Sequence, residues 1–277
     1  MMPFFKRALA LVLMMTLMIP AAYAQEEAMN ILLIGVDTAN GERSGRSDAM
    51  ILARADVQSG VIRMVSFLRD LYVPIEGVGR TRLNAAYFYG GEELLKATIR
   101  DQFGIAVDRT ATVHFAMLEQ LVDQLGGIDI EISPQERRQL NALLKDNGSA
   151  ELPEGVQHLN GRQALYYSRI RKLDSDFQRT SRQHAVIAAM LKQASALNPW
   201  QLLGLAISTL PQIRTDLTLG DVAALLPLAG RLEELSFQTA HVPFEGAYRD
   251  ETINGMMVLN PDLEQNRKKL HDFLYGE

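Results

Sequence analysis

Acidic and arginine residues gather in two segments of this chain, and their types and spacing suggest chemistry on a phosphate group. In the first segment, residues 30–70, five of them lie at or beside the ends of short apolar runs: Asp37, Arg46, Asp48, Arg69 and Asp70. Packing of a core requires none of these charges. Carboxylates are ligands for Mg²⁺ or Mn²⁺, and arginine binds phosphate bidentately while staying charged. The mixture predicts a site for a divalent cation and a phosphate.

The second segment surrounds the start of a predicted long helix that begins near 174–176 and runs to about residue 195. Its polar residues include Arg169, Arg171, Asp176, Arg179, Arg182 and Gln183. On a helix, Asp176, Arg179 and Gln183 fall within roughly 60° of one another, whereas Arg182 is about 120° from Asp176 and would serve the site less directly. A solvent-facing helix with one Asp–Arg pair is the plainer interpretation. Arginines around a helix N-terminus, however, suit a polyanion.

Hydrophobic periodicity predicts the elements that must position these residues. Apolar runs predict strands at 31–36, 49–55, 61–68, 112–115, 128–132 and 235–242, with a hairpin turn at 57–60. Helical periodicity predicts helices at 92–103, 115–125, 134–145, 161–167, 176–195, 199–210, 219–229 and 261–275, the last capped by Asn260, and a surface loop at 147–156. Because strands and helices alternate along the chain, we expect an α/β fold in one domain, a mixed central sheet with helices on both faces.

Composition narrows the class of protein. The 277 residues are 47% hydrophobic and 22% charged, with a formal net charge of −5, which argues against a general nucleic-acid binder. The chain has no cysteine, which excludes disulfides, thiolate metal sites and a cysteine nucleophile. The five histidines lack metal-ligand spacing, and P-loop, zinc-peptidase and α/β-hydrolase motifs are absent.

The N-terminal segment predicts export. Two basic residues precede an apolar run at 8–19, and Ala-Tyr-Ala follows it as a small-x-small cleavage site. The run is short for a full membrane span of about 20 residues. We therefore expect residues 1–24 to be a signal peptide or an uncleaved membrane anchor. Either alternative places the domain at 28–277 outside the cytoplasm, secreted or associated with the membrane.

Four segments carry a family resemblance: GVD…GRSDAM, SFLRD, RLNAAY and YSRIRKLDSDFQRTSRQ. Together they span residues 30–196, and in order and spacing they resemble the LytR-CpsA-Psr (LCP) family. Members of that family are exported or membrane-anchored, and they transfer glycopolymers such as teichoic acid or capsule from an undecaprenyl-pyrophosphate carrier to peptidoglycan. The resemblance implies a Mg²⁺-dependent phosphotransferase whose partners are a polyprenyl-(pyro)phosphate-linked glycan, peptidoglycan and the membrane surface, with no nucleic acid.

The resemblance also implies roles for individual residues. It places Asp37 and Asp48 at the site of Mg²⁺, or Mn²⁺. It assigns pyrophosphate binding to Arg46, Arg69, Arg169, Arg171, Arg179 and Gln183. Asp48, Arg69 and Asp70 are the expected catalytic residues, and Asp176, Arg182 and Asn84 the expected pocket residues. The polyprenyl tail would lie in an apolar tunnel between sheet and helices, for which the candidates are Leu118, Leu121, Val122 and the apolar residues of the 200s.

Three functions stay open from the sequence. The first is transfer of a sugar phosphate to a peptidoglycan hydroxyl, with polyprenyl phosphate leaving. The second is hydrolysis of polyprenyl pyrophosphate at the same site, with water as acceptor. The third is a non-catalytic polyprenyl-phosphate binder that regulates envelope assembly. The charged set favours the first, while no general base is identified beyond the candidates Asp48 and Asp70.

Overall fold

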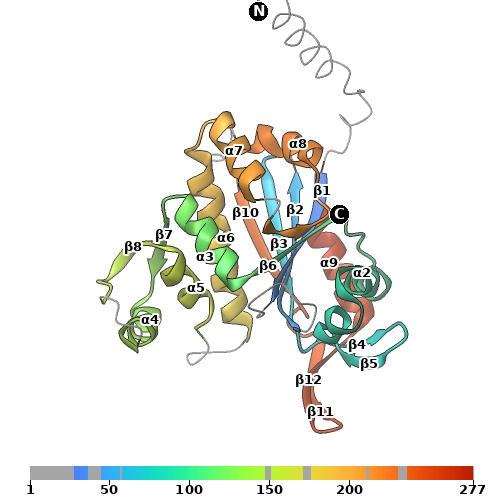
Figure 1. Cartoon of the computed structure of the whole chain (residues 1–277). Coiled ribbons are helices and arrows are strands. Elements are labelled where there is room, and N and C mark those ends of the chain that lie inside the picture. The colour runs from blue at the N-terminus through green and yellow to red at the C-terminus, as the bar shows by residue number, and fades with distance from the viewer. Residues whose placement is uncertain are drawn as a thin grey trace, which may run out of the picture.

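A six-stranded mixed sheet forms the centre of the protein (Figure 1). The computed structural model describes residues 28–36, 45–56, 58–146, 151–170, 176–209, 212–229 and 236–276. In spatial order the strands are β10 (Ser236–Val242), β3 (Val61–Phe67), β2 (Ser47–Asp56), β1 (Ala28–Val36), β6 (Arg109–His114) and β9 (Arg214–Thr215). Neighbouring strands are antiparallel, except that β1 is parallel to β6 and β3 to β10. The expected mixed sheet is confirmed.

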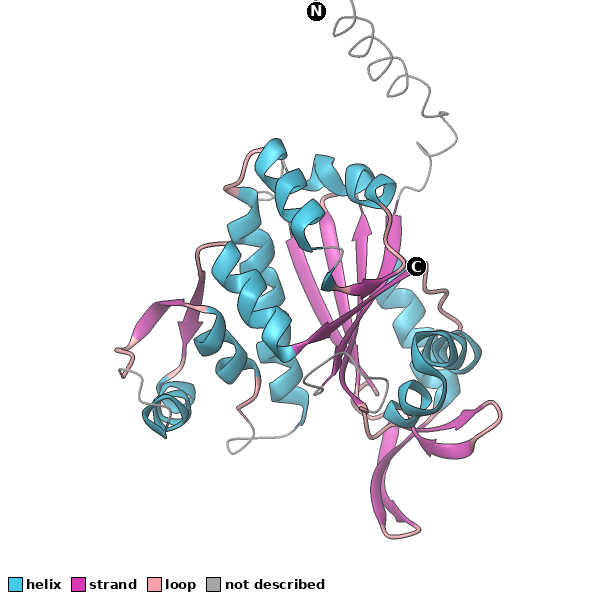
Figure 2. Ribbon diagram, in the orientation of Figure 1, coloured by secondary structure: helices cyan, strands magenta, loops and turns pink. Residues whose placement is uncertain are grey.

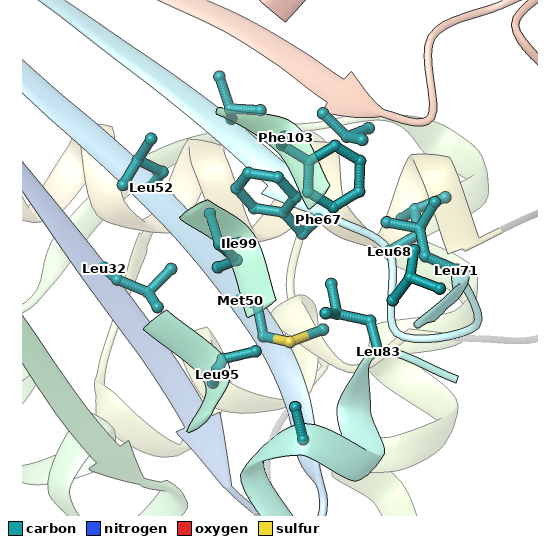
Figure 3. Close-up of a cluster of buried hydrophobic side chains, with 14 of the residues drawn as sticks. Leu32, Met50, Leu52, Phe67, Leu68, Leu71, Leu83, Leu95, Ile99 and Phe103 are labelled. Atoms are coloured by element: carbon teal, nitrogen blue, oxygen red, sulfur yellow. The ribbon is translucent and has the colours of Figure 1, made fainter. Parts of the chain in front are cut away.

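Helices cover both faces of this sheet, as expected (Figure 2). On one face lie α2 (Asn84–Phe103) and α9 (Leu263–Tyr275), and on the other lie α3 (Phe115–Gln124) and α6 (Asp176–Ser195). Figure 3 shows the first face, where side chains of α2 pack on those of the strands. The rings of Phe67 from β3 and Phe103 from α2 are 5.2 Å apart between centroids. This face forms the largest buried cluster in the described part of the chain.

Alternation along the strands explains why both faces are apolar. Successive side chains of a strand point to opposite faces. Leu32 and Met50 therefore pack toward α2 and α9, while their neighbours Leu33 and Ile51 face α6. A strand covered on both sides reads as a continuous apolar run, which is what made the first three strands predictable.

The remaining elements lie outside the central sheet. A second core holds together β7 (Ile128–Ile132), α4 (Pro134–Asp146), β8 (Gly155–Leu159) and α5 (Gly161–Ser168), packed against α3 and α6. Two further hairpins are β4 (Tyr72–Ile75) with β5 (Gly79–Arg82), and β11 (Tyr248–Ile253) with β12 (Met256–Pro261). Helices α7 (Pro199–Thr209) and α8 (Leu219–Ala229) lie at the opposite end of the sheet from these hairpins (Figure 1). Among the described residues, no helix has the length and apolar character needed to cross a bilayer.

Three element predictions were wrong in part. Strand β8 begins at Gly155, inside the expected loop, because it pairs with β7. Helix α2 has an additional first part from Asn84, and non-helical backbone at Gly90 and Gly91 kinks the helix between this part and the predicted helix at 92–103. The terminal helix is capped by Asp262, whose carboxylate accepts a hydrogen bond from the Gln265 amide, and not by Asn260, which lies in β12.

Candidate active site

One edge of the sheet collects the charged residues that the sequence singled out. Strands β1, β3, β6 and β10 all end at this edge, and β2 begins there, because β1 runs parallel to β6 and antiparallel to β2. Val36, the last residue of β1, pairs with Ser47 of β2 on one side and with His114 of β6 on the other. The edge carries Asp48 on β2 and Arg69 just after β3. The N-terminus of α6 reaches the same edge.

A β-bulge places Asp48. The register of β1 against β2 pairs Gly35 with Ala49 and Val36 with Ser47, so Asp48 is the extra residue on its strand. A bulge turns a side chain out of the regular alternation. Asp48 therefore lines the space beside the sheet edge and reaches Arg69, although its neighbour Met50 on the same strand is buried in the core.

Arg69 is the centre of a network of carboxylates. Its Nη1 lies 3.2 Å from Oδ1 of Asp48, and its Nε lies 3.4 Å from Asp176 and 3.5 Å from Asp70. Burial lowers the pKa of the Arg69 guanidinium, but the negative charges of Asp176, Asp70 and Asp48 outweigh burial and raise the pKa above its usual value. Arg69 is thus a permanent cation between three acids.

Two further arginines extend this network. Nη1 of Arg179 lies 2.9 Å from Oδ1 of Asp176, one helical turn earlier on α6. Nε of Arg82, on β5, lies 3.1 Å from Oδ1 of Asp70. Acids and guanidinium groups therefore alternate across the edge, which holds the side chains in place before a ligand arrives. Arg82 was missed as a site residue, although it stands in the RLNAAY segment beside the predicted Asn84.

An apolar cavity of about 310 Å³ opens beside this network, between the sheet and helices α3 and α6. Strand residues line one wall: Leu33, Gly35, Ala49, Ile51, Ala111 and Val113. Helical residues line the other, among them Leu118, Leu121, Val186, Ile187, Met190 and Leu191. The cavity follows α6 from Arg179 to Leu191, which at 1.5 Å per residue is about 18 Å. Its polar end contains Asp48, Arg169, Arg179 and Gln183.

Small side chains keep this cavity open. In its sheet wall, Gly35 of β1 pairs with Ala49 of β2 next to Asp48, and Ala111 of β6 pairs with Leu33 of β1 further from that end. A Cβ atom on Gly35 would stand 3.0 Å from the Ala49 Cβ, so even alanine would crowd this point. The larger residues at the same height, Ile34 and Met50, pack mainly on the other side of the sheet.

Several predicted residues come together at the polar end. Arg169, Arg179 and Gln183 line it, and the Arg169 guanidinium lies 4.2 Å from the centre of the Phe115 ring. Of the tunnel candidates, Leu118 and Leu121 line the cavity, whereas Val122 is fully buried in the neighbouring core. Arg46 is exposed and directly precedes β2. Asp37 and Arg171 lie outside the described residues.

The three expected pocket residues do not line the cavity. Asp176 stands at its rim and pairs with Arg69 and Arg179. Asn84, the first residue of α2, is buried, and its backbone N–H donates to the main-chain oxygen of Arg69 at 3.3 Å, so it supports the loop that carries Arg69.

Arg182 is also placed elsewhere. Its guanidinium donates to the Ile170 carbonyl at 2.8 Å and lies 3.5 Å from Glu136. The 120° offset around α6 turns this side chain away from the cavity and toward α4 and α5.

The carboxylates at this edge are suitable ligands for a hard cation such as Mg²⁺, but they do not surround a metal position completely. In the described ranges, no group of three acidic or histidine side chains forms a metal site. Mg²⁺ does not require one, because it commonly binds through one or two carboxylates together with phosphate oxygens and water. Asp48, on its bulge beside Arg69, presents such a carboxylate, and Asp37 follows the last residue of β1 in sequence.

An apolar cavity that ends in arginines and carboxylates fits an amphiphile with a phosphorylated head group, and comparisons with known proteins agree. The LytR_cpsA_psr family model matches residues 14–272, and the chain belongs to this family. The family resemblance of the sequence is thereby confirmed.

Named relatives give the comparison more detail. TagT of Bacillus subtilis (strain 168), a polyisoprenyl-teichoic acid–peptidoglycan teichoic acid transferase, is 30% identical over 229 residues, 80% of this chain and 70% of that protein. TagU of Oceanobacillus iheyensis, a transferase of the same description, is 32% identical over 256 residues, 88% of this chain and 75% of that protein. A solved structure of TagT bound to LIIa-WTA has a TM-score of 0.74 at 27% identity, covering 90% of this chain and 91% of the other.

Proposed function

We propose that this protein transfers a glycopolymer from a polyprenyl-pyrophosphate carrier to peptidoglycan, as an extracytoplasmic phosphotransferase. One observation carries the proposal: the apolar cavity and the arginine-carboxylate network meet at the sheet edge, as a lipid pyrophosphate requires. The names of TagT and TagU, both polyisoprenyl-teichoic acid–peptidoglycan teichoic acid transferases, support this substrate class. The predicted export segment at 1–24 agrees with a site of action outside the cytoplasm.

Binding would divide the substrate between two environments. The polyprenyl tail would lie along Leu118, Leu121 and Leu191, where burial of apolar surface stabilises it by about 25 cal/mol per Å². The pyrophosphate would remain at the polar end, within reach of Arg169 and Arg179. Guanidinium groups hold phosphate oxygens bidentately, so the head group would be oriented as well as neutralised.

The chemical step is displacement at phosphorus. A hydroxyl oxygen of peptidoglycan forms a bond to the phosphorus that carries the sugar, and the bond from that phosphorus to the bridging oxygen breaks. Polyprenyl phosphate leaves with the bridging oxygen and its electron pair, while the hydroxyl proton passes to a carboxylate of the edge. Asp48 and Asp70 are the candidate acceptors of this proton. Catalysis of this kind depends mainly on positioning and on neutralising charge, which Arg69, held by its acids, would supply.

Mg²⁺, or Mn²⁺ in its place, is the proposed cofactor. Asp37 and Asp48 would hold it, and it would neutralise charge on the pyrophosphate oxygens. The support for this proposal is the chemistry of the donor set: the carboxylate of Asp48 beside the arginines, a second carboxylate residue, Asp37, directly after β1 in sequence, and no thiolate in the chain.

A transfer assay tests the function. Full-length protein in detergent would be incubated with a radiolabelled polyprenyl-pyrophosphate-linked glycan and nascent peptidoglycan, with Mg²⁺ or with a chelator. We expect label in peptidoglycan only when Mg²⁺ is present. Arg69→Ala should lower the rate by roughly 10²–10³-fold, the usual effect of removing one charge-stabilising donor. Arg267→Ala removes an exposed arginine that donates to two main-chain oxygens of α2, and it should act as wild type.

The same assay separates the alternatives. Label released to water without peptidoglycan would identify a pyrophosphate hydrolase. Label that stays on the lipid while the lipid binds stoichiometrically would identify a regulatory binder. Transfer at the wild-type rate by Arg69→Ala would show that the charged edge is not the reaction site.

A further inference from the structure

Helix α7 exposes an apolar side that carries no charge. None of its eleven residues is charged, although 22% of the whole chain is. Trp200 is 82% exposed and Ile207 is 54% exposed. These two and the exposed Gly204 are spaced i, i+4, i+7, so they share one side of the helix.

Helix α8 continues this surface. Its only acidic residue, Asp221, is turned inward, where its carboxylate pairs with Arg109 of β6 at 2.9 Å. Leu219 is 55% exposed, and Ala223 and Ala224 are exposed as well. We call six of the exposed residues of the two helices the α7–α8 surface: Trp200, Gly204, Ile207, Leu219, Ala223 and Ala224. The other residues described as exposed on these helices are Gln201, Ser208 and Gly220, and none of them is charged.

We propose that the α7–α8 surface docks on a lipid bilayer. An exposed tryptophan beside uncharged apolar residues is the composition of a membrane–water interface, where the indole ring is preferred. The water-facing side of a helix normally carries charged residues. The salt bridge of Asp221 with Arg109 removes from the surface the charge that would oppose its contact with lipid.

The position of the surface in the fold identifies the occupant. The α7–α8 surface and Ala28, the first residue of β1, lie at the same end of the sheet (Figure 1). Eight residues, 20–27, separate Ala28 from the apolar run at 8–19. At about 3.5 Å per residue they span at most roughly 28 Å. If the run at 8–19 serves as an anchor, it keeps this end of the domain close to a bilayer.

The orientation of the cavity also supports a bilayer at this end of the domain. Its apolar end includes Leu191 of α6 and Ile213, which follows α7 in the chain, whereas its polar end is at the opposite edge of the sheet. A bilayer beneath the α7–α8 surface would therefore adjoin the apolar end. This point rests on the proposed function, but the docking itself needs only the surface and its position.

Trp200 is the only tryptophan of the chain and reports directly on docking. Full-length protein would be reconstituted into vesicles of phosphatidylethanolamine and phosphatidylglycerol, with and without lipids brominated in the acyl chain. We expect its emission to shift to shorter wavelength, to be quenched by the brominated lipids, and to be shielded from aqueous acrylamide. The measurement needs no substrate, so it is independent of the transfer assay.

Two variants complete the test. Ile207→Asp puts a charge on the α7–α8 surface and should abolish quenching by brominated lipid. Met257→Asp changes a residue that is 77% exposed on the β11–β12 hairpin, at the other end of the molecule, and should leave quenching unchanged. Trp200 that stays open to acrylamide and insensitive to bromine would overturn the proposal. Shielding from acrylamide without bromine quenching would overturn it too, because it would identify a protein as the occupant.

Discussion

The two faces of the central sheet use alternate residues of the same strands, yet one is filled and the other encloses a cavity. Toward α2 and α9, strand residues such as Leu32 and Leu52 are completely buried. Toward α3 and α6, the neighbouring positions include Gly35, Ala49 and Ala111, and an apolar space of about 310 Å³ remains. Side-chain size on one face, rather than the backbone, therefore creates the cavity.

Because of this difference, one face of the sheet serves mainly stability and the other face serves ligand binding. Interiors are close-packed, and a filled face is where large side chains contribute most to folding. An open face forgoes those contacts and can hold a ligand tail instead. We therefore expect substitutions on the two faces to affect different measurements.

The largest expected effect on stability is on the filled face. Leu52→Ala removes a side chain with no exposed surface and should lower the free energy of unfolding by about 2–5 kcal/mol. Urea unfolding followed by circular dichroism measures this change. The folded fraction should still bind polyprenyl pyrophosphate as wild type does. A loss below about 1 kcal/mol would show that the filled face is not closely packed.

On the cavity side, stability should depend on pH through His184 of α6. Its Nε2 lies 2.8 Å from Oγ of Ser66 on β3, and its ring stacks on His241 of β10. Burial, and then the nearby His241, lowers the pKa of His184 from 6.5 to about 4. The unfolded chain therefore binds a proton between these values when the native protein does not, and stability falls as pH drops.

The expected loss between pH 7 and pH 5 is about 2 kcal/mol in the free energy of unfolding, since each pH interval of one is worth about 1.4 kcal/mol. Urea unfolding at both pH values measures it, and His184→Gln should reduce the difference by that amount. An unchanged pH dependence in His184→Gln would show that this imidazole does not titrate differently in the folded and unfolded states.

A smaller effect is expected from filling the cavity. Ala49→Leu adds three carbon atoms to its wall and should weaken binding of radiolabelled polyprenyl pyrophosphate by at least about tenfold, or about 1.4 kcal/mol. The free energy of unfolding should hardly change. Ala86→Leu is the matched control, since Ala86 is fully buried on the filled face and overpacking there should cost about 1–3 kcal/mol. Unaltered binding by Ala49→Leu would exclude the cavity as the tail site.

The smallest effect concerns the cap of α9, which covers the filled face. Asp262→Ala removes the carboxylate that accepts a hydrogen bond from the backbone N–H of Gln265, and it should lower the free energy of unfolding by about 1 kcal/mol. Thermal unfolding measures the change, and lipid binding should not alter. Asn260→Ala would be the more damaging change if the cap expected from the sequence were the real one.

The sequence by itself determined the layers of the fold and most of the charged residues of the site, Arg82 excepted. Apolar runs predicted β1, β2 and β3, because a strand buried on both faces is continuously apolar. The helical spacing of Asp176, Arg179 and Gln183 placed them on one stripe of α6. The same spacing placed Arg182 about 120° from Asp176, although Arg182 was still expected in the pocket. These signals come from residues that are close in sequence, so they can be recognised without knowing which segments pack together.

Only the tertiary structure decided which of these residues meet. The bulge at Asp48 depends on the pairing of β1 with β2, and the link from Asp70 to Arg82 depends on the β4–β5 hairpin. Strand β8 likewise depends on its pairing with β7. The cap of α9 falls at Asp262 because β12 extends further than the sequence suggested. The cavity depends on which face each small residue takes, and a shift of one residue in register would exchange the faces.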